Sequence, residues 1–114
     1  MNRFKNNIKL LELLACSKSK LRNSIINGGS KELIYSVCDC ILNVMNKNIK
    51  LKSKTFKELK PYKNTFKKLL KKSKLKDKKK LIIQKGGFLQ YLIPAVISGI
   101  SSIISTIIER NKQE

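Results

Sequence analysis

The fold class of this 114-residue chain is decided by the stretch Lys31-Glu-Leu-Ile-Tyr-Ser-Val-Cys-Asp-Cys-Ile-Leu-Asn-Val-Met-Asn46. Its apolar side chains recur every three or four residues, the period of one helical face; they are Leu33, Ile34, Val37, Cys38, Ile41, Val44 and Met45. Ser30 precedes the stretch and is a suitable N-cap, because its hydroxyl can accept a hydrogen bond from a free main-chain N–H. We expect this helix at the centre of a small core.

Shorter helical patterns flank the central helix on both sides. Residues 4–15 form one amphipathic helix in this interpretation, and residues 18–27 form another that ends at Gly28-Gly29, where glycine accepts the left-handed conformation. A basic, turn-rich connector over residues 46–52 leads to Ser53, which is expected to cap a helix through Lys60. The ring of Pro61 ends that helix and starts the next, and residues 76–84 are expected to add one more.

The pattern therefore predicts an all-α protein, a small bundle of short helices with a lysine-rich helical segment and a C-terminal hydrophobic helix. The alternation expected of strands extends no further than residues 48–52. We divide the chain into a helical core region (1–46), a lysine-rich helical segment (47–85), a Gly-Gly hinge (86–87), and a hydrophobic helix with a polar end (88–114).

The positive charge of the chain is concentrated in one segment. Lys and Arg number 26 against 7 Asp and Glu, for a net charge of +19. Residues 46–85 carry seventeen lysines against Glu58 and Asp77, which is +15 of that total. Such self-repulsion is relieved by a polyanion, so nucleic acid or an acidic membrane is the expected partner. The alternative is a solvated lysine-rich face that reflects an AT-biased coding sequence.

The lysines of this segment alternate with an apolar stripe, so that one side packs while the other presents ammonium groups. The stripe consists of Phe56, Leu59, Tyr62, Phe66, Leu69 and Leu70. Lysine acts as a point charge, and no Arg occurs between residues 23 and 109, so we expect contacts to double-stranded DNA phosphates without sequence preference. The predicted contact residues are Lys50, Lys52, Lys54, Lys57, Lys60, Lys63, Lys67, Lys68, Lys71, Lys72, Lys74, Lys76, Lys78, Lys79, Lys80 and Lys85.

An uncharged apolar run of 21 residues extends from Phe88 to Ile108. As a helix it would measure about 31 Å, close to a bilayer core, although Pro94 and Gly99 interrupt it. Three interpretations remain open: a membrane-inserting helix, a helix that packs on a partner or on the rest of the chain, and a single-span anchor. The residues expected to face the membrane or partner are Leu89, Leu92, Ile93, Val96, Ile97, Ile100, Ile103, Ile104 and Ile107.

The residue types of the chain argue against an enzyme and against any cofactor or metal. The sequence has no His and three cysteines, Cys16, Cys38 and Cys40, so the common zinc and Cys-His sets cannot form. Cys38 and Cys40 lie about 200° apart on a helix and are expected to act as small apolar fillers. An odd cysteine count favours a reducing compartment, and the first residues are not typical of a signal peptide.

Two parts of the sequence resemble a known family. The segment Lys85-Gly-Gly-Phe-Leu89, followed by Tyr91-Leu-Ile-Pro-Ala95, is similar to the C-terminal part of the adenovirus core-protein precursor that matures to the mu peptide. The stretches Cys38-Asp-Cys-Ile-Leu-Asn-Val44, Tyr62-Lys63 and Lys78-Lys-Lys-Leu-Ile-Ile-Gln-Lys-Gly-Gly-Phe-Leu89 resemble the equivalent proteins of adintoviruses and Polinton (Maverick) elements. This resemblance covers about residues 31–100.

The resemblance implies a small basic protein that condenses double-stranded DNA in a virion core and in the host nucleus, alongside capsid or core proteins. It also implies a viral cysteine protease that cuts after Gly-Gly, which makes Gly86, Gly87 and Phe88 a candidate cleavage site. Gln84 stands where that protease prefers an aliphatic residue. The main alternative is a membrane-active or membrane-anchored protein whose lysines hold anionic lipid, and a further one is a protein-interaction subunit with no polyanion partner.

Overall fold

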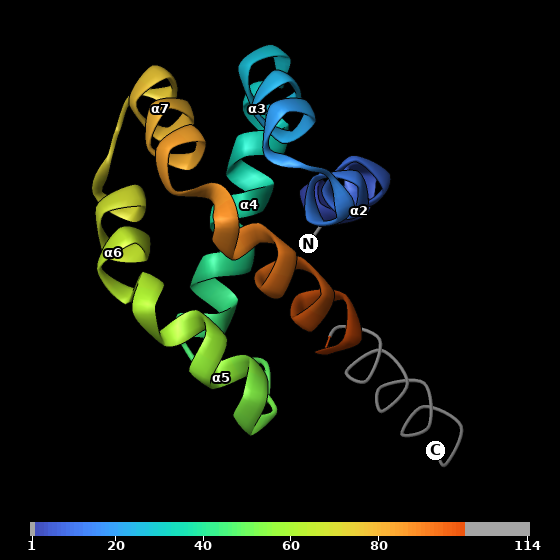
Figure 1. The fold of residues 1–114 in the computed structure, drawn as a ribbon, viewed down its shortest axis with the longest axis vertical. Coiled ribbons are helices and arrows are strands. Elements are labelled where there is room, and N and C mark those ends of the chain that lie inside the picture. The colour runs from blue at the N-terminus through green and yellow to red at the C-terminus, as the bar shows by residue number, and fades with distance from the viewer. Residues whose placement is uncertain (1, 100–114) are drawn as a thin grey trace.

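The computed structural model describes residues 2–99, and every regular element among them is helical (Figure 1). This confirms the predicted all-α class. The elements are α1 (Asn2–Asn6), α2 (Ile8–Cys16), α3 (Ser19–Gly28), α4 (Lys31–Met45), α5 (Ser53–Leu59), the 3₁₀ turn η1 (Lys60–Tyr62), α6 (Lys63–Lys71), α7 (Leu75–Lys85), the 3₁₀ turn η2 (Gly86–Phe88) and a final helix over residues 89–99.

Helix α4 lies at the centre of the bundle, as its wide apolar stripe predicts. It packs against α1, α2, α6 and α7, and Figure 1 shows it passing behind the final helix. The Ser30 hydroxyl accepts a hydrogen bond from the Leu33 N–H at 3.2 Å, which confirms the predicted N-cap. The buried side chains of α4 are Leu33, Ile34, Ser36, Val37, Cys38, Cys40 and Ile41.

The single helix predicted over residues 4–15 is broken at Asn7. The Asn7 amide donates to the Arg3 carbonyl oxygen at 2.8 Å and lies 3.4 Å from the Ser36 hydroxyl. An asparagine side chain that bonds to nearby main chain competes with the helical ladder. Ser36 lies outside the apolar stripe of α4 but is fully buried, and its hydroxyl lies within donating distance of the carbonyl oxygens of Arg3 and Glu32.

Two predicted helix ends differ from expectation in their conformation. Helix α3 does stop at the glycine pair, but Gly29 is extended (φ −69°, ψ 146°), and the one positive φ among residues 2–99 is that of Lys47 (59°). A Cβ at Gly29 would lie 2.9 Å from the Ile25 carbonyl oxygen, so close packing is the reason for a glycine there. Ser53 begins α5 without capping it, since Lys52 occupies the N-cap position.

The final helix is part of the core, which corrects the division of the chain at residues 86–87. One hydrophobic cluster joins side chains from Phe4 to Val96, and it includes Phe88, Leu89, Leu92 and Ile93, each fully buried. The Gly-Gly pair continues from α7 into η2, and Gly86 is buried. Between residues 2 and 99 the predicted segments thus fold as one body, and the pair is no hinge between separate parts.

Candidate nucleic-acid interface

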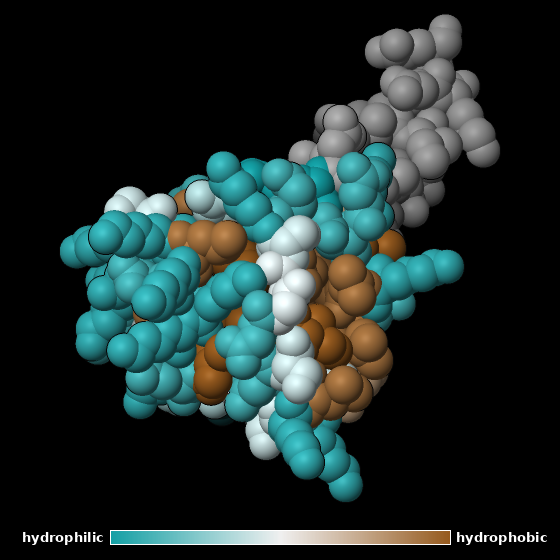
Figure 2. Space-filling model, turned by 90° about the horizontal axis from the view of Figure 1, so that it is seen from above, coloured by the Kyte–Doolittle hydropathy of each residue, from teal (hydrophilic) through white to brown (hydrophobic). Residues whose placement is uncertain are grey.

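Fourteen of the sixteen predicted contact lysines are exposed. We call them the lysine face: Lys50, Lys52, Lys54, Lys57, Lys60, Lys63, Lys67, Lys68, Lys71, Lys72, Lys74, Lys76, Lys80 and Lys85. They lie on α5, α6, α7 and the adjoining turns, which follow one side of the molecule in Figure 1. Figure 2 shows hydrophilic side chains crowded over the α6 side, whereas apolar side chains are more evident on the side of α2 and α3.

Helix α6 shows why this segment can be both folded and strongly charged. Phe66 and Leu69 are buried, while Lys63, Lys67 and Lys71, spaced four residues apart, point to the opposite, exposed side. The buried side is held by aromatic contacts to Phe88, the last residue of η2. The Phe66 and Phe88 rings meet edge to face with centroids 5.1 Å apart, and Tyr62 lies 5.8 Å from Phe88. These contacts fix the orientation of the α6 lysines.

Lys78 does not belong to the interface, and its place in the predicted contact set is wrong. Its side chain is buried, and its Nζ donates a hydrogen bond to the Leu69 carbonyl oxygen at 2.9 Å. The same ammonium lies 5.9 Å from the centroid of the Tyr35 ring, a cation–π distance. Lys78 therefore ties α7 to α6 and α4. Its position one turn before the buried Ile82 is the sequence signal that could have identified it.

Lys79 is also partly committed to the fold. It is half-buried, and its Nζ donates to the Asn27 carbonyl oxygen at 3.1 Å, which joins α7 to the end of α3. The lysines of the lysine face form no ion pair with a carboxylate among residues 2–99. The ion pair in this part of the chain joins Arg3 to Asp39 at 2.9 Å. The charge of the lysine face is thus not neutralised by carboxylates of the described chain, and it remains available to an anionic partner.

Phe56 corrects the predicted apolar stripe. It was expected to pack together with Leu59 and Phe66, yet 56% of its surface is exposed, against 4% for Leu59 and 3% for Phe66. The 3₁₀ turn Lys60–Tyr62, which contains Pro61, lies between α5 and α6. The stripe is already divided within α5, before this turn: Phe56 and Leu59 point about 60° apart around the helix axis, and only Leu59 is buried.

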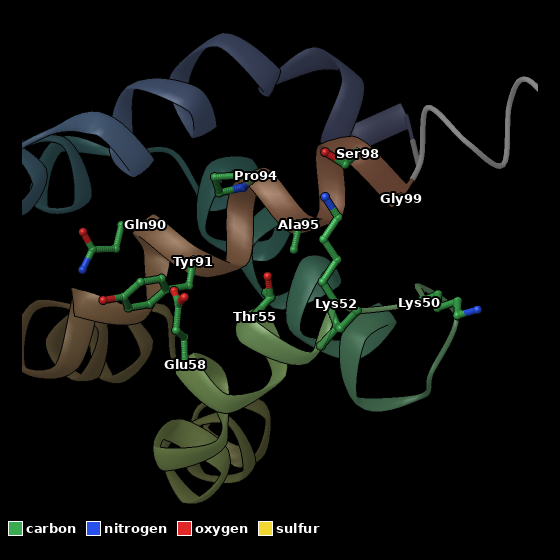
Figure 3. A pocket seen from close by; sticks show the side chains of 11 residues that line it. Lys50, Lys52, Thr55, Glu58, Gln90, Tyr91, Pro94, Ala95, Ser98 and Gly99 are labelled. Atoms are coloured by element: carbon green, nitrogen blue, oxygen red, sulfur yellow. The ribbon is translucent and has the colours of Figure 1, made fainter.

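An open cleft of about 370 Å³ separates α5 from the final helix. Thr55 and Glu58 line it from α5, Tyr91 and Ala95 line it from the final helix, and Lys52 stands at its edge (Figure 3). The lining mixes one carboxylate, hydroxyls, an aromatic ring and ammonium groups.

The cysteines occupy the positions expected of fillers. Cys38 and Cys40 are buried and Cys16 is exposed, all three as free thiols. Burial raises the pKa of the Cys40 thiol to about 12, and burial also raises the pKa of Cys38, where the Lys78 ammonium acts in the opposite direction. Among residues 2–99 no group of three His, Cys, Asp or Glu side chains is placed to hold a metal ion.

The candidate cleavage site is folded into the structure. Gly86 is buried, Gly87 is half-buried and Phe88 is fully buried inside a 3₁₀ turn. A cysteine protease binds its substrate as an extended strand across the scissile bond, and this segment has no such conformation. Gly86 and Gly87 are therefore not accessible to such a protease in the folded chain. Cleavage by a viral cysteine protease stays a prediction that applies to the unfolded or partly opened chain.

The predicted membrane or partner residues divide into two groups. Leu89, Leu92, Ile93 and Val96 face the core of the same chain and Ile97 is partly buried against it, whereas Ile100, Ile103, Ile104 and Ile107 lie outside the described residues. One helical run, Leu75–Gly99, is long and apolar enough to cross a membrane by length and composition alone, a test that buried core helices also pass. For residues 89–97, packing on the rest of the chain is the arrangement in the structure.

Comparisons with known proteins add no relative. The sequence matches no protein-family model, no curated protein and no solved structure.

Proposed function

We propose that this protein is a non-enzymatic, double-stranded DNA-binding and DNA-condensing protein that contacts phosphates through the lysine face without reading sequence. The observation that carries the proposal is the display of fourteen exposed lysines on a folded support, opposite a core-facing side. Each phosphate that a lysine neutralises releases condensed counterion, which makes binding favourable and dependent on salt. Lysine gives a point charge rather than a bidentate base contact, which fits binding without sequence preference.

The biological setting that we propose is a core protein of a virus or of a virus-like mobile element. Its support is the resemblance of residues 31–100 to the small basic proteins of adintoviruses and Polintons. In that setting the protein would act in the virion core and the host nucleus with other core or capsid proteins. Adenoviral proteins of this kind are rich in arginine and largely unstructured, so the folded, lysine-rich surface is the feature that this chain would add to the family.

The test compares two triple variants of equal charge change. Lys63→Gln/Lys67→Gln/Lys71→Gln removes three charges from α6, and Lys5→Gln/Lys9→Gln/Lys20→Gln removes three exposed charges from α1, α2 and α3. We expect the α6 variant to reduce the slope of log K against log salt by about 3 on random duplex DNA, at about 0.9 per lost contact. The second variant should change it little. Equal losses for both variants would show that net charge alone attracts DNA and would contradict an interface on α5–α7.

The competing interpretation is that the same lysines hold anionic lipid. Binding of the wild-type chain to vesicles with and without anionic headgroups provides the comparison. Vesicle binding at a salt concentration that abolishes duplex binding would favour the membrane function over DNA condensation. The burial of Leu89, Leu92 and Ile93 supports DNA rather than membrane insertion for this part of the chain, because insertion would require these side chains to leave the core.

A further inference from the structure

Phe56 is the most exposed large hydrophobic side chain among residues 2–99, with 56% of its surface exposed. The others that stand out are leucines, Leu10, Leu13, Leu21 and Leu42, on α2, α3 and α4. Phe56 thus differs from them in being aromatic and in lying on the lysine-bearing side of the molecule. An exposed phenylalanine ring among ammonium groups has the shape and the surroundings to contact a partner that is both anionic and flat.

The lysines around Phe56 are placed by the hydrogen bonds of α5. The Phe56 N–H donates to the Lys52 carbonyl oxygen at 2.9 Å, and the Lys60 N–H donates to the Phe56 carbonyl oxygen. Residues four apart lie on the same side of a helix, about 6 Å along its axis. Lys52 and Lys60 therefore lie one turn before and one turn after Phe56, and Lys57 is its exposed neighbour in sequence.

We infer that Phe56 is a stacking residue for an unpaired nucleobase, with Lys57 and Lys60 holding the adjacent phosphates of the same strand. The inference rests on the proposed nucleic-acid function and adds a ligand class to it, single-stranded nucleic acid. Aromatic stacking accepts every base, because each base has a π face, so this contact preserves binding without sequence preference. In an intact duplex the base faces are covered by their neighbours, so Phe56 has no base to stack on.

This pairing of ring and charge makes the α5 end of the lysine face different from the α6 end. On α6 the exposed positions near Lys63, Lys67 and Lys71 include no aromatic side chain, because Phe66 is buried. The α6 end therefore attracts any nucleic-acid strand by charge alone. The α5 end adds a contact that only an opened or single strand can use, such as a strand end or a locally unpaired segment.

The first experiment measures the affinities of wild type and Phe56→Ala for a 20-nucleotide single strand and for the corresponding duplex. Stacking of one base corresponds to a loss of roughly 5- to 150-fold on substitution by alanine. We expect a loss in that range on the single strand and less than about twofold on the duplex. Leu42→Ala is the matched control, since Leu42 is 42% exposed on α4 in a stretch without lysine, and it should change neither affinity.

The second experiment uses the absence of tryptophan from the chain. Phe56→Trp places the single tryptophan of the chain at the proposed contact, where it can be excited apart from the three tyrosines, and Leu42→Trp places it at the control position. Emission from the Phe56→Trp variant should be quenched by the single strand and much less by the duplex, while emission from the control should respond to neither. These variants replace exposed side chains, so they report on the contact without removing core packing.

The outcomes separate this inference from the function on which it rests. If the α6 triple variant weakens duplex binding while Phe56→Ala leaves single-strand binding unchanged, DNA binding by the lysine face is supported and base stacking by Phe56 is wrong. If Phe56→Ala weakens both forms equally, the ring does not recognise unpaired bases and the inference is also wrong. If Phe56→Ala reduces binding to anionic vesicles but not to either nucleic acid, Phe56 is a lipid contact and the inference fails.

Discussion

The Nζ of Lys78 lies 2.9 Å from the main-chain carbonyl oxygen of Leu69, so a lysine in the most basic part of the chain serves as an internal tie between two helices. Its burial separates it from Lys76 and Lys80, which lie two residues away on the exposed side of the same helix. The difference can be measured both in stability and in binding.

Lys78→Ala should lower the free energy of unfolding by about 2–4 kcal/mol, since it leaves the Leu69 oxygen without its donor and removes a packed aliphatic stem. Urea denaturation followed by circular dichroism measures the change. Lys76→Ala and Lys80→Ala should alter stability by no more than about 0.5 kcal/mol, as exposed substitutions do. Affinity for duplex DNA should show the opposite order: Lys76→Ala and Lys80→Ala should weaken binding, whereas a folded Lys78→Met variant should not. A reduced salt slope for Lys78→Met would show that Lys78 contacts DNA and would contradict its role inside the fold.

Gly99→Ala should destabilise the fold, because a Cβ there would lie 3.2 Å from Cγ1 and 3.3 Å from Cβ of Ile49, and closer still to its Cγ2. Overpacking of this kind costs about 1–3 kcal/mol. Gly28→Ala is the matched control. Nothing lies within 4 Å of its added Cβ and the residue is helical, so it should be neutral or stabilising by up to about 1 kcal/mol.

A further comparison tests whether Ile49 is the cause. The double variant Gly99→Ala/Ile49→Ala should be less destabilised than the sum of its two single variants, since the smaller side chain makes room for the new methyl group. Simple additivity would show that the effect of Gly99→Ala has another origin.

The folded chain should resist a cysteine protease that cuts after Gly-Gly, because Phe88 is fully buried and Gly86 is inside a packed turn. Gln84→Leu restores the aliphatic residue that such a protease prefers, at an exposed position of α7. We expect mass spectrometry to find cleavage after Gly87 only when urea populates the unfolded chain, for wild type and variant alike. Rapid cleavage of native Gln84→Leu would contradict the packed arrangement.

The buried thiol of Cys40 should make the free energy of unfolding fall as the pH rises above 9. Burial raises the pKa of Cys40 from 9.0 to about 12, so the native state keeps a proton that the unfolded chain loses over that range. This contribution is fully present below pH 9 and declines at up to about 1.4 kcal/mol per pH unit above it. Cys40→Ala lacks the decline, so the difference in unfolding free energy between wild type and variant should shrink as the pH rises.

Thiol labelling checks the same arrangement at neutral pH. Cys16 alone should react in the native chain, because it is the exposed cysteine, and all three should react in denaturant. Labelling of Cys40 at the rate of Cys16 would contradict its burial.

The helices were predictable where the apolar pattern is wide and where a cap is present. Helix α4 combines a stripe broad enough for contacts on several sides with a serine at its N-cap, so the local and tertiary preferences agree. Asn7 was missed because its effect depends on the Arg3 carbonyl and on Ser36, a residue 29 positions away in sequence. No local pattern contains that second contact.

The sequence predicted where the positive charge of the candidate site lies, but it predicted less well which side chains face solvent and which face the core. The exposed lysines of α6 follow directly from the helical period, whereas Phe56 was misplaced because the apolar pattern does not show which side of α5 meets the core, and only the side with Leu59 is buried. The destination of the apolar residues after Gly87 could not be derived from the sequence, because a core, a bilayer and a partner subunit all select the same aliphatic side chains.

The aromatic contacts among Tyr62, Phe66 and Phe88 pack α6 against the core, so the exposure of the α6 lysines depends on three uncharged side chains. Random mutagenesis should therefore yield two kinds of binding-defective protein. Variants of the lysine face would fold in full amount but would bind with a weaker salt dependence, whereas variants of Phe88 would keep the salt dependence and contain a smaller fraction of binding-competent molecules. A titration of active sites, and not affinity alone, is the measurement that tells the two apart.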